Sequence, residues 1–120
     1  MEQYTKILVL YLMANRYINK FYDPSDTTQV SLYTSPSNGR AIIQNIQIVN
    51  ESGNKTVKIF ITDSSASTTY QVAYASITGA TTCNMAKGPL ILEEGDSLLL
   101  QTTDTAGITA AISILEFDRT

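Results

Sequence analysis

Three acidic residues stand close together near the end of the chain, at Glu93, Glu94 and Asp96 around Gly95. Carboxylate oxygens gathered on a turn are the ligands that hard cations such as Ca²⁺ prefer. Adjacent side chains on an extended strand point to opposite faces, however, so Glu93 and Glu94 are poorly placed to share one ion. Glycine followed by aspartate is also ordinary turn chemistry. We therefore interpret this segment as a turn between two strands, and we predict no metal site and no cofactor.

The serine- and threonine-rich segment 63–69 offers hydroxyl groups that could act as nucleophiles. A serine nucleophile needs a base beside it, and the chain contains no histidine. Cys83 is the single cysteine, which excludes an intrachain disulfide framework and a zinc–thiolate cluster. We expect Cys83 to be a small buried apolar residue rather than a reactive thiol. The sequence thus predicts that the protein is not an enzyme.

Aromatic side chains are the remaining candidates for binding. They are Tyr17, Phe21, Tyr22, Tyr33, Tyr70 and Tyr74. A tyrosine ring can stack on a sugar while its hydroxyl stays in water, which is how many carbohydrate sites work. The same amphipathic ring suits a sheet edge or a contact between subunits, and tryptophan, the commonest sugar platform, is absent. We favour the subunit contact and keep sugar binding as the alternative.

Charge and hydropathy narrow the classes of partner. The chain has 120 residues, a net charge of −3 and only 16% charged residues, and its lysines and arginines are scattered along the sequence. A nucleic-acid-binding surface would need a basic patch or stripe, so we predict no nucleic-acid partner. The apolar run Ile7–Leu12 is too short to span a bilayer, so we predict no membrane partner.

Alternating apolar and polar residues predict strands through most of the chain. The predicted strands are residues 27–34, 40–50, 57–62, 70–74, 81–85, 89–92, 97–103 and 108–117. Turn residues separate them at the spacing of an all-β antiparallel two-sheet β-sandwich, of jelly-roll or Ig-like type, with about seven or eight strands.

Two local expectations accompany this fold. Within residues 40–50, strict alternation places Ile42, Gln44, Ile46 and Ile48 on one face, and the short polar connection to residues 57–62 predicts an antiparallel hairpin. The weaker alternative of a helix over Leu10–Tyr22 rests on the spacing of Met13, Tyr17 and Phe21.

The N-terminal segment contains an apolar run that would be unfavourable if it were exposed to solvent in a monomer. An apolar run such as Ile7–Leu12 promotes association when it is exposed. It is therefore either an internal strand of the sandwich or a strand added to a neighbour's sheet. We divide the chain into an N-terminal arm or added strand, residues 1–22, and a β-sandwich domain, residues 23–120. The predicted interaction residues are Ile7, Val9, Tyr11, Tyr17, Phe21 and Tyr22.

Several strand-and-turn motifs resemble small β-sandwich virion proteins of tailed bacteriophages. The resemblance covers residues 13–117 and includes residues 32–36, 46–50 and 88–96, the last with the sequence Gly-Pro-Leu-Ile-Leu-Glu-Glu-Gly-Asp. It implies a non-enzymatic particle component, either a head decoration (cement) protein or a neck, tail or fibre-associated module. It supplies no catalytic residue.

The predicted function is therefore that of a capsid decoration protein that stabilises the head through contacts between subunits. Its partners would be further copies of itself and a major capsid or other virion protein. Its location would be the virion, assembled in the bacterial cytoplasm. The alternative is a neck, tail or fibre module that binds carbohydrate or a host surface.

Overall fold

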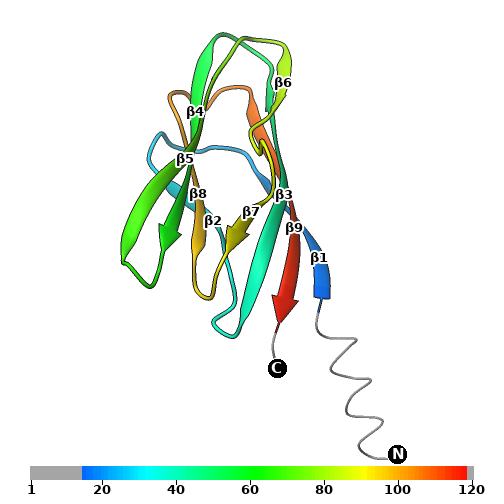
Figure 1. The fold of residues 1–120 in the computed structure, drawn as a ribbon. Coiled ribbons are helices and arrows are strands. Elements are labelled where there is room, and N and C mark those ends of the chain that lie inside the picture. Colours follow the sequence, from blue (N-terminus) through cyan, green and yellow to red (C-terminus); the bar gives the residue numbers. More distant parts are fainter. Residues whose placement is uncertain (1–14, 119–120) are drawn as a thin grey trace, which may run out of the picture.

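The computed structural model describes residues 15–118, which form nine β-strands in two antiparallel sheets (Figure 1). The strands are β1 (Asn15–Tyr22), β2 (Val30–Thr34), β3 (Gly39–Asn50), β4 (Lys55–Asp63), β5 (Thr68–Ile77), β6 (Thr81–Asn84), β7 (Leu90–Leu92), β8 (Ser97–Thr102) and β9 (Ile108–Asp118). No helix long and apolar enough to cross a membrane occurs among these residues.

The strand order is that of a jelly roll. Sheet A has the order β1-β9-β3-β6, with β7 also paired to β3, and sheet B has the order β2-β8-β4-β5. Most connections cross from one sheet to the other, whereas β4 and β5 are joined as neighbours in sheet B. The predicted two-sheet antiparallel sandwich is confirmed, and of its two proposed types the jelly roll is the one observed.

The strand that brings the number from the predicted seven or eight to nine is β1. It pairs with β9 along its whole length, from Asn15 opposite Phe117 to Tyr22 opposite Ala110. The helix considered for Leu10–Tyr22 is therefore wrong for residues 15–22. A spacing of four residues is a multiple of the strand period as well as close to the helix period, so Tyr17 and Phe21 lie on one face of either element. The division of the chain at residue 22 stays a prediction.

The predicted hairpin between residues 40–50 and 57–62 is also wrong. The strand β3 belongs to sheet A and β4 to sheet B, so the turn between them crosses from one sheet to the other. The Asn50 side chain is completely buried at this crossing and donates to the carbonyl oxygens of Gly53 (2.7 Å) and Ile77 (3.0 Å). These bonds fix the turn so that the inner faces of β3 and β4 lie opposite each other across the core.

A β-bulge in β3 changes which residues enter the core. Ile43 pairs with Ile114 and Asn45 pairs with Ser113, so Gln44 is the extra residue. Before the bulge Ala41 and Ile43 point inward, and after it Ile46 and Ile48 do. Strict alternation had placed Ile42 with Ile46, and the bulge moves Ile42 to the outer face.

The core lies between the inner faces of the two sheets. Its largest fully buried apolar side chains are Ile43, Ile46, Ile48, Val57, Ile59, Leu92, Leu98, Leu100, Ile112 and Ile114. They come from five strands, which are β3, β7 and β9 of sheet A and β4 and β8 of sheet B. Such a core follows from alternating strands that each contribute one apolar face.

Candidate functional site

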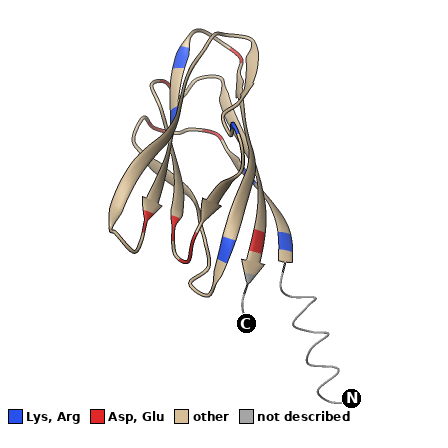
Figure 2. Ribbon diagram, viewed as in Figure 1, with Lys and Arg blue, Asp and Glu red and all other residues tan. Residues whose placement is uncertain are grey.

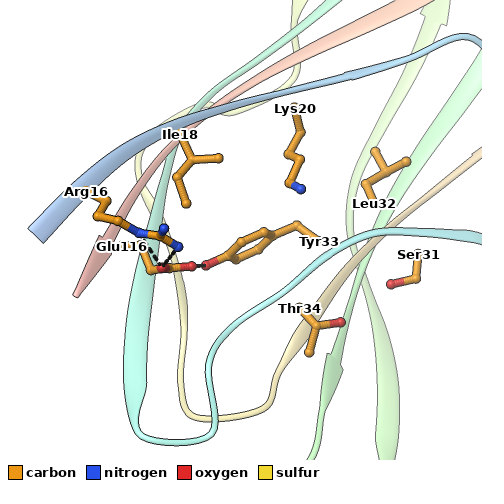
Figure 3. Close-up of a pocket in the computed structure, with 8 residues that line it drawn as sticks. All are labelled: Arg16, Ile18, Lys20, Ser31, Leu32, Tyr33, Thr34 and Glu116. Atoms are coloured by element: carbon orange, nitrogen blue, oxygen red, sulfur yellow. Dashed lines mark hydrogen bonds and ion pairs between the residues drawn. The ribbon is translucent and has the colours of Figure 1, made fainter. Parts of the chain in front are cut away.

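A buried carboxylate joins three strands at one side of the sandwich. Glu116 continues the inward-facing positions of β9, after Ile112 and Ile114, and is only 5% exposed. Arg16 of β1 donates to Glu116 Oε1 from Nη2 (2.6 Å) and Nε (3.2 Å). The hydroxyl of Tyr33, on β2 in sheet B, donates to Glu116 Oε2. Figure 3 shows Arg16 and Tyr33 reaching Glu116 from opposite sides, so this cluster connects sheet A to sheet B.

The pKa values of the cluster follow from burial and from these bonds. Burial by itself raises the pKa of Glu116, but the hydrogen bonds from Tyr33 and Arg16 and the charges of Arg16 and Lys20 outweigh burial and lower it. The pKa of Tyr33 is raised well above its ordinary value, first by burial and then by the hydrogen bond to the Glu116 carboxylate. Glu116 is therefore an ionised acceptor and Tyr33 a neutral donor at neutral pH.

A hollow of about 370 Å³ lies beside this cluster, between the edge strands β1 and β2. Its lining comprises Arg16, Ile18, Lys20, Ser31, Leu32, Tyr33, Thr34 and Glu116 (Figure 3). Both oxygens of the Glu116 carboxylate already accept hydrogen bonds. The arrangement is suited to fixing the edge strands of the two sheets rather than to proton transfer.

Sequence reasoning missed this cluster, although a signal for it was present. Glu116 lies in phase with Ile108, Ala110, Ile112 and Ile114, the apolar face that the sequence predicts to be buried. A charged residue at an inward position of a strand needs a partner, because burying an unpaired charge is costly. That phase relation would have identified the residue, but not its partners on β1 and β2.

A buried lysine obeys the same rule at the opposite end of the molecule. Lys55 is 4% exposed and in phase with the core residues Val57 and Ile59. Its ammonium group donates to Asn50 Oδ1 (3.2 Å) and to the carbonyl oxygen of Ser52. The lysine thus fastens the crossing turn between β3 and β4.

The acidic segment is a turn, as predicted. Asp96 is buried and accepts hydrogen bonds from the backbone N–H groups of Glu93 (2.9 Å) and Ser64 (3.0 Å). Arg40 pairs with Glu94 at 2.9 Å. Asp96 therefore ties two turns of the sandwich together. Within the described part of the chain, no three Cys, Asp or Glu residues gather into a group that could hold a metal ion.

The predicted interaction residues fall into three positions. Tyr17 and Phe21 lie on the outer face of sheet A and are 79% and 73% exposed, whereas Tyr22 lies on the inner face and packs against the core. Ile7, Val9 and Tyr11 lie outside the described residues. The role of all six in contacts between chains stays a prediction.

Two other predicted groups are located by the structure. Cys83 is half-buried on β6 and packs against the core. In the serine-rich connection between β4 and β5, Asp63 accepts hydrogen bonds from the N–H and hydroxyl groups of Ser65 (3.0 and 2.7 Å). These bonds account for the turn conformation of that segment.

The comparisons with known proteins identify the fold. No protein-family model matches the sequence, and no curated protein matches it. Among solved structures, a chain of the acid-stable capsid of Helicobacter pylori bacteriophage KHP30 has a TM-score of 0.57 at 10% identity, with 87% of each chain covered. A chain of the Bacillus endospore appendages, described as disulfide-linked pili, has a TM-score of 0.55 at 10% identity, with 88% of each chain covered.

The same fold also occurs outside capsids and pili. The Drosophila NLP core, a protein described in terms of pentamer formation and histone binding, has a TM-score of 0.50 at 9% identity, with 88% of this chain and 97% of that chain covered. This chain is thus a jelly-roll β-sandwich that resembles capsid and pilus proteins in fold. Identities this low establish the architecture alone.

Proposed function

We propose that this chain is a non-enzymatic structural protein of a phage virion, and that it decorates the capsid as a homo-oligomer. The observation that carries the proposal is a jelly-roll sandwich whose buried charged residues, Lys55, Asp96 and Glu116, hold strands and turns together, while large apolar side chains remain exposed on its outside. Its similarity in fold to a chain of a phage capsid supports the same role.

The proposed mechanism is the burial of apolar and tyrosine surface between subunits, with the apolar segment Ile7–Leu12 added to a neighbour's sheet. On a particle, each subunit meets several neighbours at once. Every contact after the first is then effectively intramolecular, so individually weak contacts hold the subunit firmly.

Mass spectrometry of purified virions tests this proposal. The chain should be present in many copies per particle and should remain with the heads when heads and tails are separated. Absence of the chain from purified virions would refute a virion role. Recovery with the tails alone would refute capsid decoration and favour the alternative below.

A specific observation supports a carbohydrate-binding module of the neck, tail or fibre as the second candidate. Tyr70 and Tyr74 on β5 are 53% and 61% exposed. Tyr74 also lines a hollow of about 240 Å³ together with Lys87 and Pro89. An exposed aromatic ring beside a partly polar hollow is suited to stacking on a sugar. Binding on a glycan array that is lost in Tyr74→Ala would favour this module over decoration.

A further inference from the structure

The outer face of sheet A is almost free of charge. Strand residues 15–117 of this sheet place a single charged side chain, Arg40, on that face, and it is already paired with Glu94. Figure 2 shows most of the sheet positions without Lys, Arg, Asp or Glu. The cores of protein interfaces are depleted of charged residues, and this face has the same composition.

An apolar row runs across four of the five strands of sheet A, at one level of this face. The register places Tyr17 of β1 opposite Leu115 of β9, Leu115 opposite Ile42 of β3, and Ile42 opposite Ile91 of β7. Tyr17 and Ile91, at the two ends of the row, are 79% and 61% exposed. Leu115 and Ile42, at its centre, are half-buried.

Sheet B presents no comparable row. Its outer face is also poor in charge, and Phe60 pairs with Leu99 at its centre. Phe60 is already buried, however, and the residues at the two ends of this level are the polar Ser31 and Gln71. Its exposed apolar side chains, Tyr70, Val72 and Tyr74, all lie on the edge strand β5. The two faces of the sandwich are therefore not equivalent as docking surfaces.

We propose that the outer face of sheet A packs against the same face of a second copy of this chain. This inference rests on the proposed function as a self-associating particle subunit and names the surface that would be used. The two copies are related by a two-fold axis that lies between their two sheet A faces and runs parallel to the strands. This axis reverses the order of the row in the second copy. It places Tyr17 of one copy over Ile91 of the other, and Leu115 over Ile42.

The low charge of this face is compatible with a second copy as the occupant. Each chain carries a net charge of −3, so two copies repel each other wherever their charged surfaces meet. The outer face of sheet A minimises that repulsion. Arg40 of β3 and Phe117 of β9 are opposite each other in the sheet register. The two-fold axis places β3 of one copy over β9 of the other, so Arg40 lies over Phe117 of the second copy, where a cation can contact the aromatic ring.

The area of this face is close to that of a standard interface. The strands of sheet A comprise 38 residues in total, which at about 3.4 Å per residue and about 4.8 Å spacing give a face of roughly 600 Å². A stable interface of standard size buries about 800 Å² on each partner. Two such faces, stacked about 10 Å apart as in a β-sandwich, therefore come close to this size before any other contact is counted.

Sedimentation velocity on the full chain, over about 1–100 µM, tests the surface. We expect a dimer in the wild type and a roughly 100-fold or greater rise in the dissociation constant for Ile91→Lys, because each dimer then buries two unpaired charges. Tyr74→Lys is the matched control, since Tyr74 is as exposed as Ile91, at 61%, but lies on sheet B. Its dissociation constant should stay within about threefold of the wild type. Circular dichroism verifies that both variants are folded.

Chemical cross-linking tests the arrangement within the dimer. Packed sheets are too far apart for a direct disulfide, so a short bismaleimide is used in a Cys83→Ser background. A mixture of Tyr17→Cys and Ile91→Cys chains should cross-link, whereas Tyr17→Cys chains alone should not. The reverse pattern would overturn the arrangement.

The results separate this inference from the proposed function. A monomeric wild type, or an Ile91→Lys chain that associates as the wild type does, would overturn the inference even if the protein is found on virions. A dimer that depends on Ile91 would support the inference even if virions lack the protein, and the virion role alone would then fail.

Discussion

Removal of a single oxygen atom tests the idea that the cluster around Glu116 fastens the two sheets. In Tyr33→Phe the ring remains, and since Tyr33 is 7% exposed and packed in the core, its apolar contacts are retained. The carboxylate loses the donor to Oε2 but keeps both bonds from Arg16 to Oε1. The substitution therefore isolates the bond between the sheets.

The size of the effect follows from the bond type. A hydrogen bond to a charged group contributes about 1.5–3 kcal/mol. Because Glu116 keeps its ion pair with Arg16, the loss should stay below the 3–5 kcal/mol typical of a broken buried ion pair. We expect the free energy of unfolding to fall by about 2 kcal/mol. For a chain of 120 residues this corresponds to a decrease in Tm of roughly 8 °C.

Urea denaturation at pH 7, followed by circular dichroism, measures the change. Tyr74→Phe is the control, because that tyrosine is 61% exposed and its hydroxyl is in reach of water, so its change should stay within about 0.5 kcal/mol. Combining Tyr33→Phe with Glu116→Gln should show coupling, since the residues interact directly. A Tyr33→Phe variant as stable as the Tyr74→Phe control would refute the inter-sheet role.

Three further outcomes are expected. Because the pKa of Glu116 is lowered, its contribution to stability is complete above its ordinary value of 4.5 and is lost as the pH falls through the lower folded value. Urea titrations from pH 7 to 3 should show a loss of unfolding free energy in the wild type that Glu116→Gln lacks. Parallel pH profiles of the two proteins would contradict this. Asp96→Ala should lower the free energy of unfolding by about 2–3 kcal/mol, because two backbone N–H groups lose their acceptor. Asp96→Asn should lower it by less in the same assay. If both variants are as stable as the wild type, Asp96 does not tie the two turns together. Deletion of residues 1–12 should lower the copy number on virions measured by quantitative mass spectrometry, and unchanged occupancy would count against the arm.

The sequence predicted structure correctly where a feature depends only on residues that are close together in the chain. The turn at Gly95-Asp96 was predictable because the side chain of aspartate can accept hydrogen bonds from its own turn, as it does from Glu93. The strand Ile108–Asp118 was predictable because its inward positions from Ile108 to Ile114 are apolar with a period of two. Both features depend on neighbours in sequence.

Features that depend on distant residues were missed or mistaken. The turn after Asn50 crosses between the sheets, although its local sequence is that of a hairpin turn. One acceptor of the buried Asn50 side chain, the carbonyl oxygen of Ile77, lies 27 residues away in the chain and could not be inferred from the turn itself. The bulge at Gln44 is likewise defined by the pairing of β3 with β9.

The sequence by itself determined that this is an all-β sandwich with little charge, because alternation, turn residues and composition are local properties. Tertiary structure alone decided the jelly-roll order, the partners of Glu116 and the row from Tyr17 to Ile91. Each of these joins residues that are far apart in the chain, and their proximity depends on strand pairing. The register of the folded sheet, not the spacing along the chain, sets which side chains meet.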